Sequence, residues 1–157
     1  MPTSGTFLIR CRGCGATNRV PRETVYAGLE AICARCTRPL TVEGRPRTVT
    51  DATFAADVER ALLPVLLDAW APWCWPCQML APLVEELGIE LAGRLRVSKL
   101  NVDENRSTAM RFDITSLPTL LILDRGREIE RIVGLQTKAE IARRIARVLH
   151  ARARAAS

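Results

Sequence analysis

Apolar positions in residues 48–157 follow two spacings, which predict strands and helices in alternation. Two runs are almost wholly apolar, as is typical of strands buried on both faces of a sheet: residues 64–70 and 117–123. Another strand is predicted over residues 95–102. A fourth strand is predicted at residues 128–133, because the turn residues Asp124, Arg125 and Gly126 join it to the preceding strand as an antiparallel hairpin.

Helical spacing of apolar residues fills the intervals between these strands. Thr50 or Asp51 is placed to cap a short helix that ends near Ala61. Further helices are predicted over residues 78–92, 105–112 and 137–149, and Thr137 with Glu140 forms a capping box for the last. This alternation of strands and helices predicts an α/β fold with a central mixed sheet flanked by helices.

Cys74 and Cys77 lie between the first apolar run and the helix after it, in the segment W-A-P-W-C-W-P-C. A strand, a C-x-x-C pair and a helix in this order suit a pair that cycles between dithiol and disulfide. A helix N-terminus at Cys74 favours its thiolate, because unpaired N–H groups and the helix dipole stabilise negative charge there. Pro76 suits the first helical turn, and Cys77, one turn in, can attack a mixed disulfide that Cys74 forms.

The other four cysteines, Cys11, Cys14, Cys33 and Cys36, have the spacing C-x2-C-x18-C-x2-C. Two C-x-x-C turns bring four sulfurs together, and four thiolates make a tetrahedral zinc site with no open position for catalysis. A piece this small lacks a sufficient core, so zinc is expected to supply its folding energy. The alternative, two short disulfides or free thiols, is disfavoured in a reducing compartment.

Asp68 interrupts the apolar run six residues before Cys74. Burial disfavours the charged form of a carboxyl group, so the pKa of Asp68 is expected to rise. Such a group near a reactive pair is a candidate for function. The alternative is a structural aspartate whose carboxylate is hydrogen-bonded.

Composition separates a four-cysteine piece, residues 1–47 with a linker at 44–47, from a larger piece, residues 48–157. The first piece has eight arginines against three glutamates, so it carries +5 of the chain's net +6. A basic piece is typical of nucleic-acid contacts, but thiolate ligands would lower its charge and arginine is this chain's common cation. We therefore expect no nucleic-acid partner.

Membrane and export signals are missing from the pattern. No apolar run reaches the ~20 residues of a membrane span, and residues 1–10 lack the apolar core of a signal peptide. We therefore expect a cytoplasmic protein with no membrane partner.

Three further residues carry chemistry for which the sequence suggests no use. His150 is far in sequence from every cysteine, and we interpret it as a satisfied or solvent-facing residue. Met79 and Met110 are interpreted as packing residues.

The segment W-A-P-W-C-W-P-C resembles the active site of the thioredoxin family. The resemblance covers about residues 48–150, and the residues that carry it in family order and spacing are Phe54, Asp68, Ala69, Trp70, Pro82, residues 99–103, residues 114–119, Val133 and Gly134. The four-cysteine piece is similar to that of the two-domain, zinc-carrying bacterial thioredoxins. We therefore expect a thioredoxin fold preceded by a small zinc-ribbon-like domain.

The resemblance implies a role for each matching residue. Cys74 would attack the substrate disulfide, Cys77 would resolve the mixed disulfide, and Asp68 would help to deprotonate Cys77. Lys99 would tune the pKa of Asp68, and Pro118 would follow a cis peptide bond and hold substrate backbone. The implied docking surface is apolar and consists of Trp73, Trp75, Pro76, Leu117, Val133 and Gly134.

The resemblance also implies partners and a direction of chemistry. We expect a protein-disulfide reductase that acts on disulfide-containing proteins and takes electrons from an NADPH-dependent thioredoxin reductase. No bound redox cofactor is needed, and because nothing demands a dimer we expect a monomer.

Two residues depart from the family pattern. Trp75 replaces the glycine of the usual Gly-Pro pair between the cysteines, and Gln78 stands where a lysine is common. Trp75 leaves open a more oxidising disulfide isomerase or oxidase, since the residues between the cysteines help to set the reduction potential. The four-cysteine piece leaves open a zinc-based redox-sensing or binding module in which thioredoxin chemistry is secondary.

Overall fold

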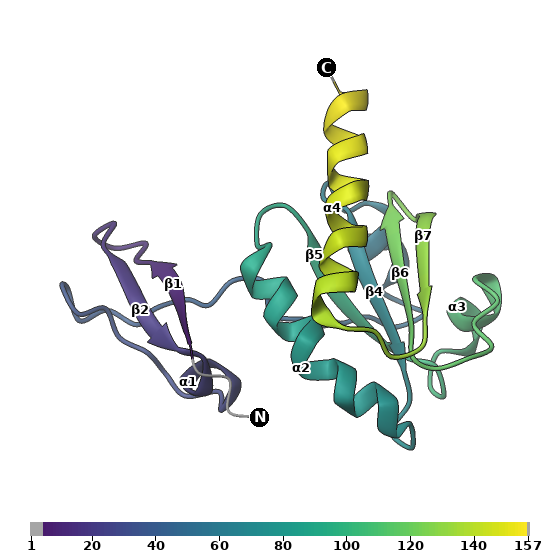
Figure 1. Ribbon diagram of the computed structural model, residues 1–157, viewed down its shortest axis with the longest axis horizontal. Coiled ribbons are helices and arrows are strands. Elements are labelled where there is room, and N and C mark those ends of the chain that lie inside the picture. Colours follow the sequence, from purple (N-terminus) through teal and green to yellow (C-terminus); the bar gives the residue numbers. More distant parts are fainter. Residues whose placement is uncertain (1–4, 157) are drawn as a thin grey trace. The chain divides into compact units, whose positions relative to one another are not determined.

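Two units, which divide between Glu43 and Gly44, make up the chain in a computed structural model that describes residues 5–156 (Figure 1). Residues 1–4 and Ser157, at the outer ends of the two predicted domains, lie outside the described residues. No helix within residues 5–156 is both long enough and apolar enough to cross a membrane.

The first unit is built around a two-stranded antiparallel sheet. Its elements are β1 (Thr6–Arg10), β2 (Thr17–Pro21) and the short helix α1 (Arg22–Tyr26). Buried and exposed positions alternate along both strands, and the buried side chains are Phe7, Ile9, Asn18 and Val20. An isolated bridge between Ile32 and Pro39 forms a second, shorter hairpin. With so narrow an inner face, this unit has a small apolar core.

The second unit contains the predicted mixed sheet of five strands. They are β3 (Arg47–Thr48), β4 (Val65–Trp70), β5 (Arg96–Asn101), β6 (Thr119–Asp124) and β7 (Arg127–Val133). Their order across the sheet is β3-β5-β4-β6-β7. The first three strands are parallel, whereas β6 runs antiparallel to β4 and β7 antiparallel to β6. The predicted strands and the hairpin are confirmed.

The helices of this unit cover the two faces of the sheet. They are the π-helical turn η1 (Ala55–Glu59), α2 (Trp75–Glu90), α3 (Arg106–Arg111) and α4 (Lys138–Ala155). Alternation along β4 sends Leu66 into a cluster with residues of α2 and α4, and Leu67 into a second cluster with Phe54 and Val58. In Figure 1, α2 and α4 lie together against one side of the sheet. Asp68, two residues after Leu66, therefore belongs to the face that α2 covers.

Thr50 and Asp51, the two candidate caps, have separate partners. The Thr50 hydroxyl accepts a hydrogen bond from the Thr53 N–H, which supports the turn before η1. Asp51 instead caps α3, because its carboxylate accepts hydrogen bonds of 2.9 Å from the Thr108 N–H and 2.7 Å from the Thr108 hydroxyl. These bonds lower the pKa of Asp51. The α3 helix is thus held to the start of the unit by a residue distant in sequence.

Gly44 and Gly88 bring two backbones into direct contact inside the second unit. A Cβ atom on either glycine would collide with the carbonyl oxygen of the other. Gly44 also has a φ of 88°, in the left-handed region that favours glycine. The segment predicted as a linker is grouped with the second unit, and Arg47 pairs with Ser98 as the first residue of β3.

Candidate functional site

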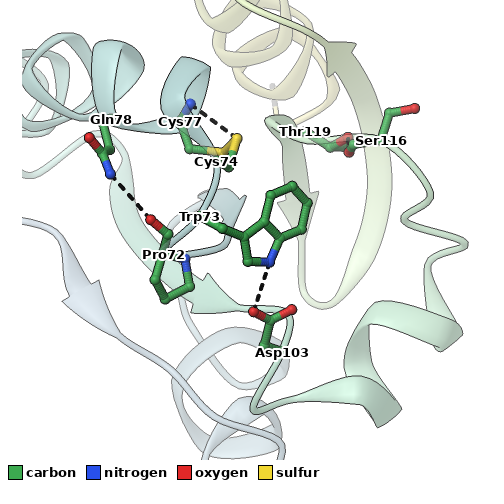
Figure 2. The surroundings of a disulfide bond; sticks show 8 residues. All are labelled: Pro72, Trp73, Cys74, Cys77, Gln78, Asp103, Ser116 and Thr119. Carbon is green, nitrogen blue, oxygen red and sulfur yellow. Dashed lines mark hydrogen bonds between the residues drawn. A yellow bond between two sulfur atoms is a disulfide. The ribbon is translucent and has the colours of Figure 1, made fainter.

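Cys74 and Cys77 lie where β4 ends and α2 begins, and they are joined as a disulfide with a Cα–Cα distance of 5.3 Å. Cys74 is the N-cap of α2, and its sulfur accepts a 3.2 Å hydrogen bond from the Cys77 N–H (Figure 2). Both side chains are 3% exposed. Pro76 occupies the first turn of the helix, where its missing N–H leaves no hydrogen bond unmade. A thiolate at Cys74 would therefore meet a backbone donor and the positive end of the helix dipole.

Asp68 is a buried carboxyl group without a hydrogen-bond partner. It is 1% exposed, and neither carboxylate oxygen is hydrogen-bonded to any of the described residues. Burial raises its pKa to about 6, although the charge of Lys99, its register partner on β5, acts in the opposite direction. The alternative of a hydrogen-bonded structural aspartate is therefore not supported, and the group can exchange a proton near neutral pH.

The side chain of Lys99 also contacts the aromatic ring of Trp70. Its Nζ lies 5.1 Å from the centroid of the Trp70 ring, within the range of a cation–π contact. The sequence prediction that Lys99 lies near Asp68 is met by the parallel pairing of β4 and β5.

The peptide bond between Leu117 and Pro118 is cis, as the resemblance implied. The Gly134 N–H donates a 2.8 Å hydrogen bond to the Pro118 carbonyl, which joins the loop before β6 to the end of β7. Leu117 packs against the cluster that contains both cysteines of this disulfide. The structure thus brings residues from three separate segments of the chain to the disulfide.

Most of the predicted docking residues are solvent-accessible. Trp73 is 71% exposed, Trp75 65% and Val133 51%, while Pro76, Leu117 and Gly134 are half-buried. Pro118 itself is buried. Large exposed apolar side chains beside buried sulfurs are typical of a surface that binds another molecule.

Two polar contacts at the disulfide were not predicted from the sequence. The indole N–H of Trp73 donates a 3.0 Å hydrogen bond to Asp103, and the Gln78 side chain donates one of 3.2 Å to the Pro72 carbonyl (Figure 2). The first fixes an exposed ring at its polar edge. The second ties the chain before the cysteines to the helix after them. A signal was present only for Asp103, which lies two residues after the end of β5 and so at the same edge of the sheet as the end of β4.

The four remaining cysteines form a cluster in the first unit. Their sulfur atoms all lie within 4.8 Å of one another. Two of the separations that cross from one C-x-x-C turn to the other are 3.5 Å, between the Cys11 and Cys36 sulfurs, and 3.6 Å, between the Cys14 and Cys33 sulfurs. Four thiols at this spacing could bind a metal ion, and their soft sulfur donors suit zinc.

The two turns of this cluster have the same backbone hydrogen-bond pattern. The Cys11 N–H donates to the Ala16 carbonyl and the Cys33 N–H to the Arg38 carbonyl, both at 2.8 Å. In each turn, the N–H of the second cysteine is the main cause that lowers the pKa of the first cysteine's thiol, to about 6 in the case of Cys33. The backbone thus favours thiolates at the two positions.

Outside these two clusters, the minor sequence interpretations have mixed outcomes. His150 is exposed, as expected of a solvent-facing residue. Met110 is 76% exposed and Met79 48%, so the interpretation of both as packing residues is wrong. Met79 lies on α2 and Met110 on the short α3.

Comparison with known proteins places the second unit in a large family. The family model of thioredoxin matches residues 45–147. Thioredoxin of Mycobacterium tuberculosis is 48% identical over 101 residues, which cover 64% of this chain and 87% of that protein. Thioredoxin of Synechocystis sp. is 47% identical over 94 residues, 60% of this chain and 88% of that protein. A bifunctional thioredoxin reductase/thioredoxin of Mycobacterium leprae is 45% identical over 101 residues, 64% of this chain and 22% of that protein.

Proposed function

Because the chain belongs to the thioredoxin family, it is a thiol–disulfide oxidoreductase, and we propose that it acts mainly as a reductase of protein disulfides. One arrangement carries this proposal: Cys74 and Cys77 are bonded at the N-terminus of α2, with the buried carboxyl group of Asp68 on the sheet face that this helix covers. The pair has a position for an ionised thiol and a nearby group that can accept a proton.

Cys74 is the proposed nucleophile. Its thiolate attacks one sulfur of a substrate disulfide, forms a mixed disulfide and expels the other substrate sulfur as a thiolate. The Cys77 thiolate then attacks the Cys74 sulfur, which forms the Cys74–Cys77 bond and releases the second substrate sulfur. Two electrons pass from the protein to the substrate, and each released thiolate takes up a proton.

Asp68 is the proposed base for the second attack. A pKa of about 6 leaves it mostly ionised at neutral pH but still basic enough to take the proton of the Cys77 thiol. Lys99 limits the rise of this pKa, since its charge favours the carboxylate. A fully neutral Asp68 could not act as a base, so the opposition of burial and Lys99 supports this role.

Substrates are proposed to dock across the disulfide. Trp73, Trp75 and Val133 supply exposed apolar surface, and Pro76, Leu117 and Gly134 complete it around the buried sulfurs. The loop of Pro118 is held by the Gly134 N–H, so it offers a fixed backbone edge to a substrate segment.

The proposed electron donor is an NADPH-dependent thioredoxin reductase, with no redox cofactor bound to the chain itself. The Mycobacterium leprae relative carries both activities in its name, which supports such a pairing of donor and acceptor. A cytoplasmic setting and a monomeric state, without nucleic acid or membrane, complete the proposal.

For the first unit we propose one structural Zn²⁺, held by Cys11, Cys14, Cys33 and Cys36. The clustering of the four sulfurs supports this assignment, and a small core calls for a further source of folding energy, which a metal supplies. Bound zinc would hold the two turns together, and all four of its positions would be filled by protein. The unit is then a structural rather than a catalytic metal site.

Two serine variants test the reductase mechanism. Cys74→Ser should abolish the reduction of insulin disulfides and trap no substrate, because the attacking thiol is gone. Cys77→Ser should also lose turnover but accumulate mixed disulfides, which mass spectrometry of the captured protein would locate on Cys74. Substantial insulin reduction by Cys74→Ser would overturn the assigned role.

A second candidate, an oxidase or isomerase on the same frame, is favoured by the exposed Trp75 between the cysteines. The discriminating measurement is the reduction potential of the Cys74–Cys77 couple, by equilibration with glutathione. A value near the roughly −270 mV typical of thioredoxin supports a reductase, whereas one tens of millivolts less negative supports an oxidant. Trp75→Gly, measured beside the parent, isolates the contribution of the indole.

A further inference from the structure

Asn18 is a buried polar residue in the first unit whose presence packing alone does not explain. It sits on the inner face of β2 and is 8% exposed. Burying an amide costs free energy unless its donors and acceptor find partners. The partners of Asn18 therefore indicate what it does.

Among the described residues, the hydrogen-bond partners of the Asn18 side chain belong to the two cysteine turns. The Asn18 Oδ1 accepts a 2.9 Å hydrogen bond from the Ala34 N–H, which fixes the orientation of the amide because a backbone N–H can only donate. Its Nδ2 then faces the Ala16 carbonyl at 3.2 Å and the Cys33 sulfur at 3.5 Å. One side chain thus joins the first turn, at Ala16, to the second turn, at Cys33 and Ala34.

The two cysteine turns share a backbone pattern, and comparing them shows that only the first is followed by a side-chain amide. Each turn gives its first cysteine sulfur a backbone N–H, from Gly13 to Cys11 at 3.3 Å and from Arg35 to Cys33 at 3.4 Å. The turns are offset by 22 residues, so the position that corresponds to Asn18 in the second turn is Leu40. Leu40 is also 8% exposed. An apolar side chain is enough to fill this kind of position, whereas Asn18 provides a donor to a sulfur.

We propose that Asn18 is a positioning residue for the metal: it donates to the Cys33 thiolate and locks the two ligand turns together. This inference rests on the proposed zinc site. Hydrogen bonds to ionised acceptors are about twice as strong as neutral ones, so a ligand thiolate gains from an additional donor. Groups that hold a metal ligand in this way typically change affinity by about 10–100-fold when they are lost.

The test uses three variants of the full chain, reduced and loaded with zinc. Asn18→Leu copies the residue of the sister turn, so it should fold but lacks the donor. Asn18→Asp keeps the size and the acceptor for the Ala34 N–H, but it places a negative charge where the donor was. Thr17→Asp, on the exposed face of the same strand, is the control for an added charge.

Two measurements report on the metal itself. Zinc release to a chromophoric chelator should be about 10–100-fold faster in both Asn18 variants than in the parent, and unchanged in Thr17→Asp. With Co²⁺ in place of zinc, the sulfur-to-cobalt charge-transfer band should move to longer wavelength in both, because a thiolate that loses a donor is easier to oxidise.

A parental release rate and an unshifted band in Asn18→Leu would overturn the inference and reduce Asn18 to packing. Should Asn18→Asp fail to fold, the Asn18→Leu result alone decides. A parent chain that binds neither Zn²⁺ nor Co²⁺ tightly would overturn the zinc site, and the inference with it.

Discussion

Around Cys33 and Cys36 the backbone turns back on itself, whereas around Cys74 and Cys77 it continues into a helix. Within the four residues the two segments are alike, since the N–H of Thr37 bonds to the Cys33 carbonyl and that of Gln78 to the Cys74 carbonyl. They part at the next residue. Thr37 and its counterpart Gly15 have left-handed φ angles of 61° and 77°, but Gln78 stays helical. The backbone of the residue directly after a C-x-x-C pair therefore decides whether the pair closes a turn or starts a helix.

A second difference is the number of other cysteine sulfurs that lie near each pair. The turns at Cys11 and Cys33 face each other, so every sulfur has neighbours from the other turn. Cys74 and Cys77 are the only two cysteines of their unit, where they are bonded to each other at the rim of a well-packed sheet. Four gathered thiolates suit a metal ion, while two isolated ones suit a reversible bond.

The strongest way to break this contrast is to remove one metal ligand. Cys33→Ser should lose the zinc and unfold the first unit, since structural zinc contributes about 10–16 kcal/mol of apparent binding free energy in small domains. Insulin reduction should persist, because the second unit has its own core. The measurements are metal content, hydrogen exchange of β1 and β2, and insulin turnover. Loss of turnover would show that the metal unit governs the enzyme, as the redox-sensing alternative requires.

Truncating a core side chain of the second unit should destabilise that unit and leave the first unit intact. Leu80 is fully buried in the cluster between α2, α4 and the sheet, so Leu80→Ala should lower the free energy of unfolding of the second unit by about 2–5 kcal/mol. Zinc content should not change. Urea titration followed by tryptophan fluorescence measures the loss. Leu62→Ala, at a site that is 83% exposed, is the control and should cost little.

Asp68 makes the stability of the second unit depend on pH. Its pKa in the folded protein, about 6, lies above the ordinary 3.8, so between these pH values the folded state binds more protons than the unfolded state. Stability therefore falls as pH rises through this window, and the buried charge costs about 3 kcal/mol above it. Asp68→Asn should be more stable than the parent by about that amount near pH 8, with the difference gone below about pH 4.

Urea titrations of the oxidised protein measure this effect without interference from thiol ionisation. Asp113→Asn, at an exposed position, is the control for the aspartate-to-asparagine substitution itself. If the gain for Asp68→Asn were the same at both pH values, the buried carboxyl group would not titrate as described. Reduced Asp68→Asn should also resolve mixed disulfides more slowly at neutral pH, as expected when a proton acceptor is lost.

The smallest expected effect concerns Gln78. A cation at this exposed position would favour the Cys74 thiolate and hence the reduced form, by roughly 0.5 kcal/mol. Gln78→Lys should therefore make the reduction potential less negative by about 10 mV. Gln78→Met, which lacks both the charge and the hydrogen bond to Pro72, separates the two contributions. A shift of equal size in both variants would assign the effect to the lost hydrogen bond.

The sequence alone predicted the parts of the structure that depend on local pattern. Residue spacing within short stretches of sequence predicted the apolar run of β4, the position of Cys74 at a helix start and the grouping of four cysteines. Asp68 was recognised for the same reason, because a carboxyl group stands out in an apolar strand. The cis bond before Pro118 came from family resemblance, since no local pattern specifies it.

The features that were missed depend on pairs far apart in sequence. Asp51 has the sequence position of a local cap but binds Thr108, and Asn18 is indistinguishable from a surface residue until Cys33 is placed beside it. The bond from Trp73 to Asp103 likewise needs the parallel register of β4 and β5. Periodicity reports which face a residue is on, and it carries no information about the partner on that face.

For protein engineering, the close approach of Gly44 and Gly88 reverses a familiar rule. Glycine within a helix is a standard target, because replacing it with alanine usually gains about 0.5–1 kcal/mol. Gly88 lies inside α2 and invites that change, yet the added methyl group would strike the Gly44 carbonyl. The helix that begins at the active site therefore needs a residue without a side chain at Gly88, where the segment around Gly44 packs against it. A library of stabilising substitutions should leave both glycines unchanged.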